Sequence, residues 1–138
     1  MKKIIIPLLF VCINSCHAQK IVKKISDTKK LENNKTQFIG KEFKELLYQI
    51  SPKIKTALGN PEQASNTRLS SISLYFVDKN QFLSRKKSGQ NPIRVIVTLK
   101  KGKAASYPKL DPNEQWSEKL LNIYGDMIIV DIAVLGEN

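Results

Sequence analysis

The sequence PIRVIVTLK, from Pro92 to Lys100, gives the clearest indication of how this chain folds. One set of alternate residues is entirely apolar and consists of Ile93, Val95, Val97 and Leu99. The other set is mixed and consists of Arg94, Ile96, Thr98 and Lys100. A period of two that is rich in β-branched residues is typical of a strand with one buried face. Such a strand needs hydrogen-bonding partners and a covering layer, so a sheet is predicted.

Two other segments have the pattern of strands. Residues 70–78 alternate, with Ile72, Leu74 and Phe76 on one predicted face. Residues 127–135 are apolar on both predicted faces, which indicates a strand that is covered on both sides. Strict alternation would place four residues of that strand on one face: Ile128, Val130, Ile132 and Val134. Antiparallel pairing needs no crossover connection, so a three-stranded antiparallel sheet is predicted.

Three segments have the pattern of helices. In KEFKELLYQI, residues 41–50, apolar residues recur at helical spacing, which predicts an amphipathic helix. Pro52 suits the first turn of a second short helix, from Pro52 to Leu58, which Gly59 stops. Asp111 followed by Pro112 predicts the start of a third helix, which carries Trp116 and precedes the last strand.

These elements predict an α+β fold, with an N-terminal helix or helix pair packed on the three-stranded antiparallel sheet and an additional helix before the last strand. Residues 38–138 are expected to form the single domain, because roughly 100 residues suffice for one core. Residues 19–37 are rich in lysine and show no sustained apolar period. They are therefore expected to be a flexible spacer.

Residues 1–18 have the pattern of a signal peptide. Two lysines precede an apolar run from Ile4 to Ile13, which is shorter than the roughly 20 residues that a spanning helix needs. Ile13-Asn14-Ser15-Cys16 resembles the lipobox of bacterial lipoproteins, and this resemblance implies lipidation of Cys16. Alternatively, residues 16–18 form a small-residue cleavage site that releases a soluble protein before Gln19.

Composition limits the chemistry that the mature chain can carry. The chain has 23 basic and 12 acidic residues, a net charge of +11, which favours anionic partners. Cys12, Cys16 and His17 all lie in the leader region, so the expected domain has no thiol or imidazole. We therefore expect no disulfide framework, no metal site, no cofactor and no enzymatic activity.

Two groups of residues are candidate binding sites. The first is a mixed strand face, expected to bind a ligand or a strand, that consists of Tyr75, Arg94, Ile96, Thr98 and Asp131. The second is an anion-binding patch, formed by two basic loops if the central strand is short, that consists of Arg85, Lys86, Lys87, Lys100, Lys101 and Lys103. Solvated loops and ordinary packing are the alternative interpretations of these groups.

The segment FIGKEFKELLYQI, followed by ALGNP and then by strands, resembles small outer-membrane assembly lipoproteins that are built as two helices on a three-stranded sheet. The resemblance implies a periplasmic envelope protein, anchored to a membrane by lipid, that binds another envelope protein or an anionic glycan or lipid surface. Nucleic acid is not an expected partner of an exported protein. The alternatives are a small secreted hydrolase that uses carboxylates such as Asp126 and Asp131, and an inhibitor or immunity-type protein for an acidic partner.

Overall fold

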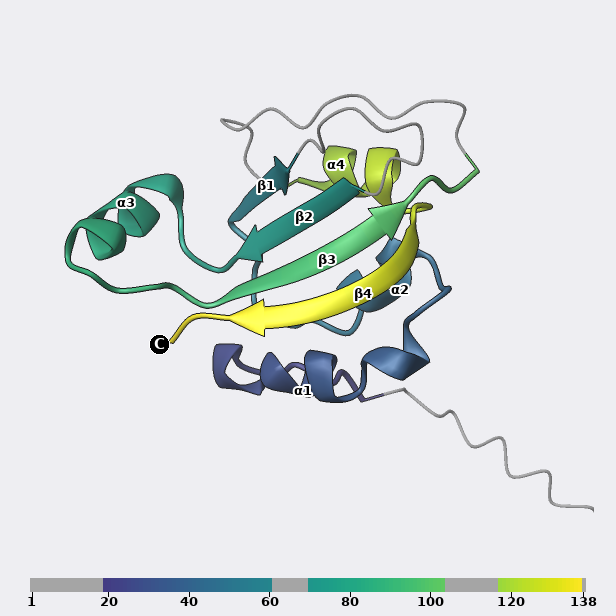
Figure 1. Cartoon of the computed structure of the whole chain (residues 1–138), viewed down its shortest axis with the longest axis horizontal. Helices are drawn as coiled ribbons and strands as arrows, with labels where there is room; N and C mark the ends of the chain where they lie inside the picture. The colour runs from purple at the N-terminus through teal and green to yellow at the C-terminus, as the bar shows by residue number, and fades with distance from the viewer. Residues whose placement is uncertain (1–18, 61–69, 104–116, 138) are drawn as a thin grey trace, which may run out of the picture.

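The computed structural model describes residues 19–60, 70–103 and 117–137. Its centre is an antiparallel four-stranded sheet in the order β1-β2-β3-β4 (Figure 1). The strands are β1 Thr56–Asn60, β2 Ser70–Tyr75, β3 Arg94–Lys100 and β4 Ile128–Leu135. The helices are α1 Lys29–Asn33, α2 Phe43–Leu47, α3 Lys79–Lys87 and α4 Glu118–Tyr124, with 3-10 turns η1 Ile25–Asp27 and η2 Lys35–Gln37. The predicted α+β class and antiparallel sheet are confirmed, and the sheet has one strand more than predicted.

The central strand β3 behaves as its alternation predicts. It pairs with β2 on one side and with β4 on the other. Val95, Val97 and Leu99 are fully buried, whereas Arg94 and Thr98 are partly exposed on the opposite face. The buried residues join a single hydrophobic cluster that includes side chains from α1, α2, α4 and all four strands.

The prediction of a second short helix at residues 52–58 was wrong. The chain is extended from Thr56 and forms β1, which pairs antiparallel with β2. Thr56 explains this preference, because its hydroxyl donates a buried hydrogen bond of 2.9 Å to the carbonyl of Val77. Ala57 is fully buried. The apolar pattern of a five-residue strand is too short to be distinguished from one turn of helix.

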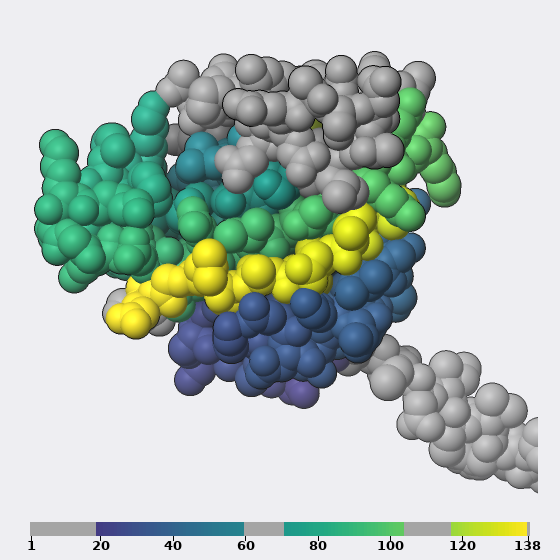
Figure 2. Space-filling model, viewed as in Figure 1, coloured from purple at the N-terminus to yellow at the C-terminus, as the bar shows by residue number. Residues whose placement is uncertain are grey.

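The expectation of a flexible spacer at residues 19–37 does not hold either. Val22 and Leu31 are fully buried in the same cluster as the sheet residues. Val22 also pairs with the end of the α2 region: its N–H donates to the carbonyl of Gln49 at 3.0 Å, and its carbonyl accepts from Ser51 at 2.8 Å. These residues are therefore part of the packed unit, and the surface of the N-terminal segment lies directly against β4 in Figure 2.

The outer edge of β4 is covered by chain that precedes α2. The N–H of Gly40 donates to the carbonyl of Ile129 at 2.8 Å. Farther along the strand, the Lys29 ammonium donates to the carbonyl of Val134 at 3.5 Å, and the Glu32 carboxylate accepts from the backbone of Val134. An uncovered edge strand invites pairing with other chains. The N-terminal segment removes that liability from β4.

A β-bulge in β4 changes which of its residues face the core. Thr98 pairs with Asp131 and Leu99 pairs with Ile129, so Val130 is an extra residue on its strand. Such an insertion reverses the alternation beyond it. As a result Ile129, Ile132 and Val134 are buried together. The predicted common face of Ile128, Val130, Ile132 and Val134 was therefore wrong.

The two predicted long helices are only partly reproduced. α2 covers Phe43–Leu47, and the residues after it form turns rather than further helix. α4 has Ser117 at its N-cap and buries Leu120 and Tyr124. The predicted helix start at Asp111 and Pro112, and Trp116 itself, lie outside the described residues. No helix among the described residues is long and apolar enough to cross a membrane.

Candidate functional site

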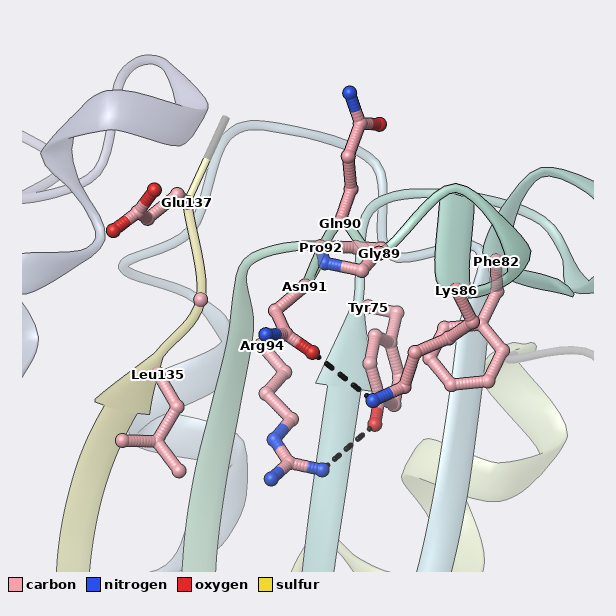
Figure 3. A pocket seen from close by; sticks show the side chains of 11 residues that line it. Tyr75, Phe82, Lys86, Gly89, Gln90, Asn91, Pro92, Arg94, Leu135 and Glu137 are labelled. Atoms are coloured by element: carbon pink, nitrogen blue, oxygen red, sulfur yellow. Dashed lines mark hydrogen bonds between the residues drawn. The ribbon is translucent and has the colours of Figure 1, made fainter. Parts of the chain in front are cut away.

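A pocket of about 610 Å³ lies at the end of the sheet where β2 leads into α3 and β3 begins (Figure 3). Side chains from three parts of the fold converge on it. Tyr75 comes from the end of β2, Lys86 from the last turn of α3 and Arg94 from the start of β3. The residues after β4, including Glu137, line another side. We call this site the cationic pocket and define it by Tyr75, Lys86 and Arg94.

Strand register places the first two polar groups side by side. Tyr75 and Arg94 are direct partners in the β2–β3 ladder, so their side chains leave the sheet on the same face. The Arg94 Nη1 group donates a hydrogen bond of 3.2 Å to the Tyr75 hydroxyl oxygen. Because Arg94 donates this bond, the phenolic hydrogen of Tyr75 can be donated in turn to an acceptor in the pocket.

Helix α3 brings the third group to the pocket. Asp78 begins the helix with a capping box, in which its carboxylate accepts from the N–H of Gln81 at 2.8 Å. Phe82 then packs edge-on against the Tyr75 ring, with the centroids 4.9 Å apart. Lys86 lies four residues after Phe82 and therefore on the same side of the helix. This aromatic contact fixes α3 so that the Lys86 ammonium lies over the pocket (Figure 3).

Two glycines with positive φ lie in the lining of the pocket. Gly89 ends the helical segment with φ +75°, and Gly136 follows β4 with φ +96°. A Cβ at Gly136 would collide with the backbone carbonyls of Asn91 and Pro92. The N–H of Glu137 donates to the Asn91 carbonyl at 2.8 Å. These contacts hold the chain end against the loop that leads into β3.

The charge balance of the pocket favours an anion. The Lys86 ammonium donates a hydrogen bond of 3.0 Å to the amide oxygen of Asn91. Because this amide is neutral, the hydrogen bond does not neutralise the charge of Lys86. Arg94 contributes a second positive charge and is hydrogen-bonded to the neutral Tyr75 hydroxyl. Among the described residues that line the pocket, Glu137 is the one that carries a carboxylate, and this group points away from Lys86 and Arg94 in Figure 3. Guanidinium, ammonium and hydroxyl donors together suit a carboxylate or phosphate group.

The five residues of the predicted ligand face share one face of the sheet, but they do not form one site. Tyr75 and Arg94 lie in the cationic pocket, and Ile96 is two residues farther along β3. Thr98 pairs with Asp131 at the other end of that strand. Four residues of strand separate Arg94 from Thr98 by roughly 13 Å. The predicted face is thus divided between two ends of the sheet.

Asp131 takes part in a surface ion pair with the N-terminal segment. The Lys35 ammonium contacts its carboxylate at 2.6 Å. The hydrogen bond from Lys35 lowers the pKa of Asp131 below its ordinary value, and the same bond raises the pKa of Lys35. The pair therefore ties the turn η2 to β4 beside the edge contacts described above.

The two predicted basic loops do not meet in a single patch. Arg85, Lys86 and Lys87 form the last turn of α3, before β3, whereas the other group follows β3. Because β3 has seven residues, it separates the two groups by roughly 20 Å. The second group consists of Lys100, Lys101 and Lys103. The Lys103 ammonium lies 3.4 Å from the Glu42 carboxylate. The single-patch prediction was therefore wrong, and Lys86 instead joins Tyr75 and Arg94.

Sequence reasoning missed Asn91, Gly136 and Glu137 as parts of the site. Gly136 was the one available signal, because a glycine directly after a strand is typical of a backbone that needs positive φ or close approach. Among the described residues, no group of three or more His, Cys, Asp or Glu side chains could hold a metal ion. Cys16, the predicted lipidation site, lies outside the described ranges.

Comparison of the chain with protein-family models, with curated proteins and with solved structures gave no match. The chemistry of the site therefore has to be argued from its own residues.

Proposed function

We propose that this protein is a non-catalytic binding module of the cell envelope, anchored by lipid on Cys16, whose cationic pocket holds an anionic group of its partner. The observation that carries the proposal is the convergence of Tyr75, Lys86 and Arg94, from three different elements, on one pocket of about 610 Å³. Both cationic side chains make their observed hydrogen bonds to neutral groups. An incoming carboxylate or phosphate would supply their charge partner.

The walls of the pocket indicate what accompanies the anionic group. Phe82 is partly exposed, and the Leu135 side chain is 47% exposed. A partner that presents an acidic group next to an apolar one can therefore contact both kinds of surface. An acidic segment of another envelope protein, or the uronic acid of an envelope glycan, has this chemistry.

Binding can be tested with defined anions. The protein is titrated with N-acetylglutamate, glucuronate and glycerol phosphate while the NMR signals of the Arg94 guanidinium are followed. At least one anion should bind in a salt-sensitive manner. Arg94→Gln should weaken that binding about 10- to 100-fold, since a hydrogen bond to a charged group contributes roughly 1.5–3 kcal/mol.

Lys86→Gln should weaken binding in the same way, and Lys87→Gln is the matched control because its exposed lysine is outside the pocket lining. Equal affinity in the wild type and in Arg94→Gln would contradict the proposal. The anchor is tested separately: Cys16→Ser should move the protein from the membrane fraction to the soluble fraction, and unchanged fractionation would count against lipidation.

A further inference from the structure

A second hollow, of about 410 Å³, lies where the described chain begins. Gln19 and Ile21 line it from the N-terminal segment, and Phe38, Lys41 and Tyr48 line it from the region around α2. The Tyr48 side chain is 59% exposed, the largest exposed fraction among the large hydrophobic side chains of the described residues. A tyrosine presented in this way has an apolar ring and a polar tip at the protein surface.

The chain at this hollow is held firmly. Val22, directly after Ile21, exchanges two backbone hydrogen bonds with the segment that follows Tyr48. Val22 is also fully buried. The described chain therefore begins at a fixed point beside Tyr48.

Chain length limits how far Cys16 can lie from the same point. Cys16 is three residues before Gln19, and three residues of extended chain span at most roughly 10 Å. Because Val22 is already fully buried, a lipid on Cys16 would be joined to the packed chain by only a few residues. The anchor would therefore hold the hollow next to the membrane.

The charges around the hollow suit an anionic membrane surface. Lys20 and Lys41 are exposed, and Glu45 is the acidic residue in the lining. Basic residues near an anionic leaflet are attracted to it, and tyrosine is enriched at the level of the headgroups. The lysines and the tyrosine therefore both favour a membrane surface with anionic headgroups.

We propose that Lys20, Lys41 and Tyr48 form a membrane-facing surface that rests on anionic phospholipid headgroups. The inference rests on the lipid anchor proposed above, and it adds a direction: the domain has one fixed side toward the bilayer. The cationic pocket is built on α3 and on the β2–β3 ladder, elements that do not contribute to this surface.

The orientation is measured on the lipidated protein reconstituted into vesicles of phosphatidylcholine and phosphatidylglycerol. A single cysteine is introduced at Gln37, which is exposed and lines the hollow, and is labelled with an environment-sensitive fluorophore. Ser84→Cys on α3 is the matched control, because Ser84 is equally polar and exposed. The label at position 37 should be quenched by spin-labelled headgroups and the label at position 84 should not. Equal quenching at both positions would overturn the proposal.

A second measurement separates this surface from the anchor. The processed Cys16→Ser protein is sedimented with phosphatidylglycerol vesicles, and the bound fraction is compared with that on phosphatidylcholine alone. Lys20→Gln and Lys41→Gln should each lower binding about fivefold, the ratio that corresponds to ~1 kcal/mol per basic residue at an anionic surface. Lys87→Gln should leave it unchanged. A failed anchor with preserved lysine dependence would leave the surface supported, whereas no preference for the anionic vesicles would overturn it.

Discussion

Leu31→Ala tests whether the N-terminal segment is part of the folded unit. In a flexible spacer Leu31 would be exposed to solvent. In this structure its exposed fraction is 0%, and it lies in the main hydrophobic cluster. The substitution removes three carbon groups, which at ~0.8 kcal/mol each amount to a loss of about 2.4 kcal/mol. The cavity left behind raises the expected loss to between about 2.5 and 5 kcal/mol.

The assay is urea unfolding followed by circular dichroism. With a slope of about 1.5 kcal/mol per molar urea, a loss of about 3 kcal/mol lowers the midpoint by about 2 M. Asn33→Ala is the control, because Asn33 is exposed on the same helix and surface changes are usually within about 0.5 kcal/mol. A Leu31→Ala midpoint within the same range as the control would refute the packing of α1 against β4.

Three further substitutions or conditions test the rest of the fold. Gly136→Ala should lower stability by at least about 1 kcal/mol in thermal unfolding, because it forces a Cβ into the left-handed region and against backbone carbonyls; an unchanged melting temperature would contradict this. Thr56→Val should cost about 1–3 kcal/mol in urea unfolding, because the buried carbonyl of Val77 loses its donor; a neutral result would mean that this bond does not stabilise β1. Hydrogen bonds from lysine partners lower the pKa of Glu32 and Asp131 in the fold. The resulting stability is present above the ordinary values of 4.5 and 3.8 and is lost as pH falls through the lower folded values. The urea midpoint should therefore fall on acidification, and Glu32→Gln combined with Asp131→Asn should make that fall shallower. An equally steep fall in the double variant would show that these two pairs are not its source.

The local sequence pattern was sufficient to predict an element where the pairing of that element leaves its alternation undisturbed. The alternation of Val95, Val97 and Leu99 predicts β3 because that strand is central and has one fully buried face. β1 escaped prediction because five residues do not define a period. The face of β4 was misassigned because a bulge at Val130 is a property of strand pairing, which no single-segment pattern contains.

The N-terminal segment and the site were harder to predict for a related reason. Val22 and Leu31 are buried by different partners, the α2 region and the sheet, so their spacing follows no helical or strand period. Tyr75 and Arg94 could be placed on one face from alternation alone. Lys86 could not be added to them, because its position depends on the packing of Phe82 against Tyr75.

The coverage of β4 by the N-terminal segment has a consequence for the order in which the chain folds. Lys29 and Val134, which are in contact, are 105 positions apart in sequence, so the contacts between α1 and β4 wait until β4 has been synthesised. Contacts between such distant segments form late and slowly. A nascent chain that lacks β4 has neither a partner for one side of β3 nor the strand against which α1 packs. Synthesis of β4 is therefore the event that allows this protein to close its core.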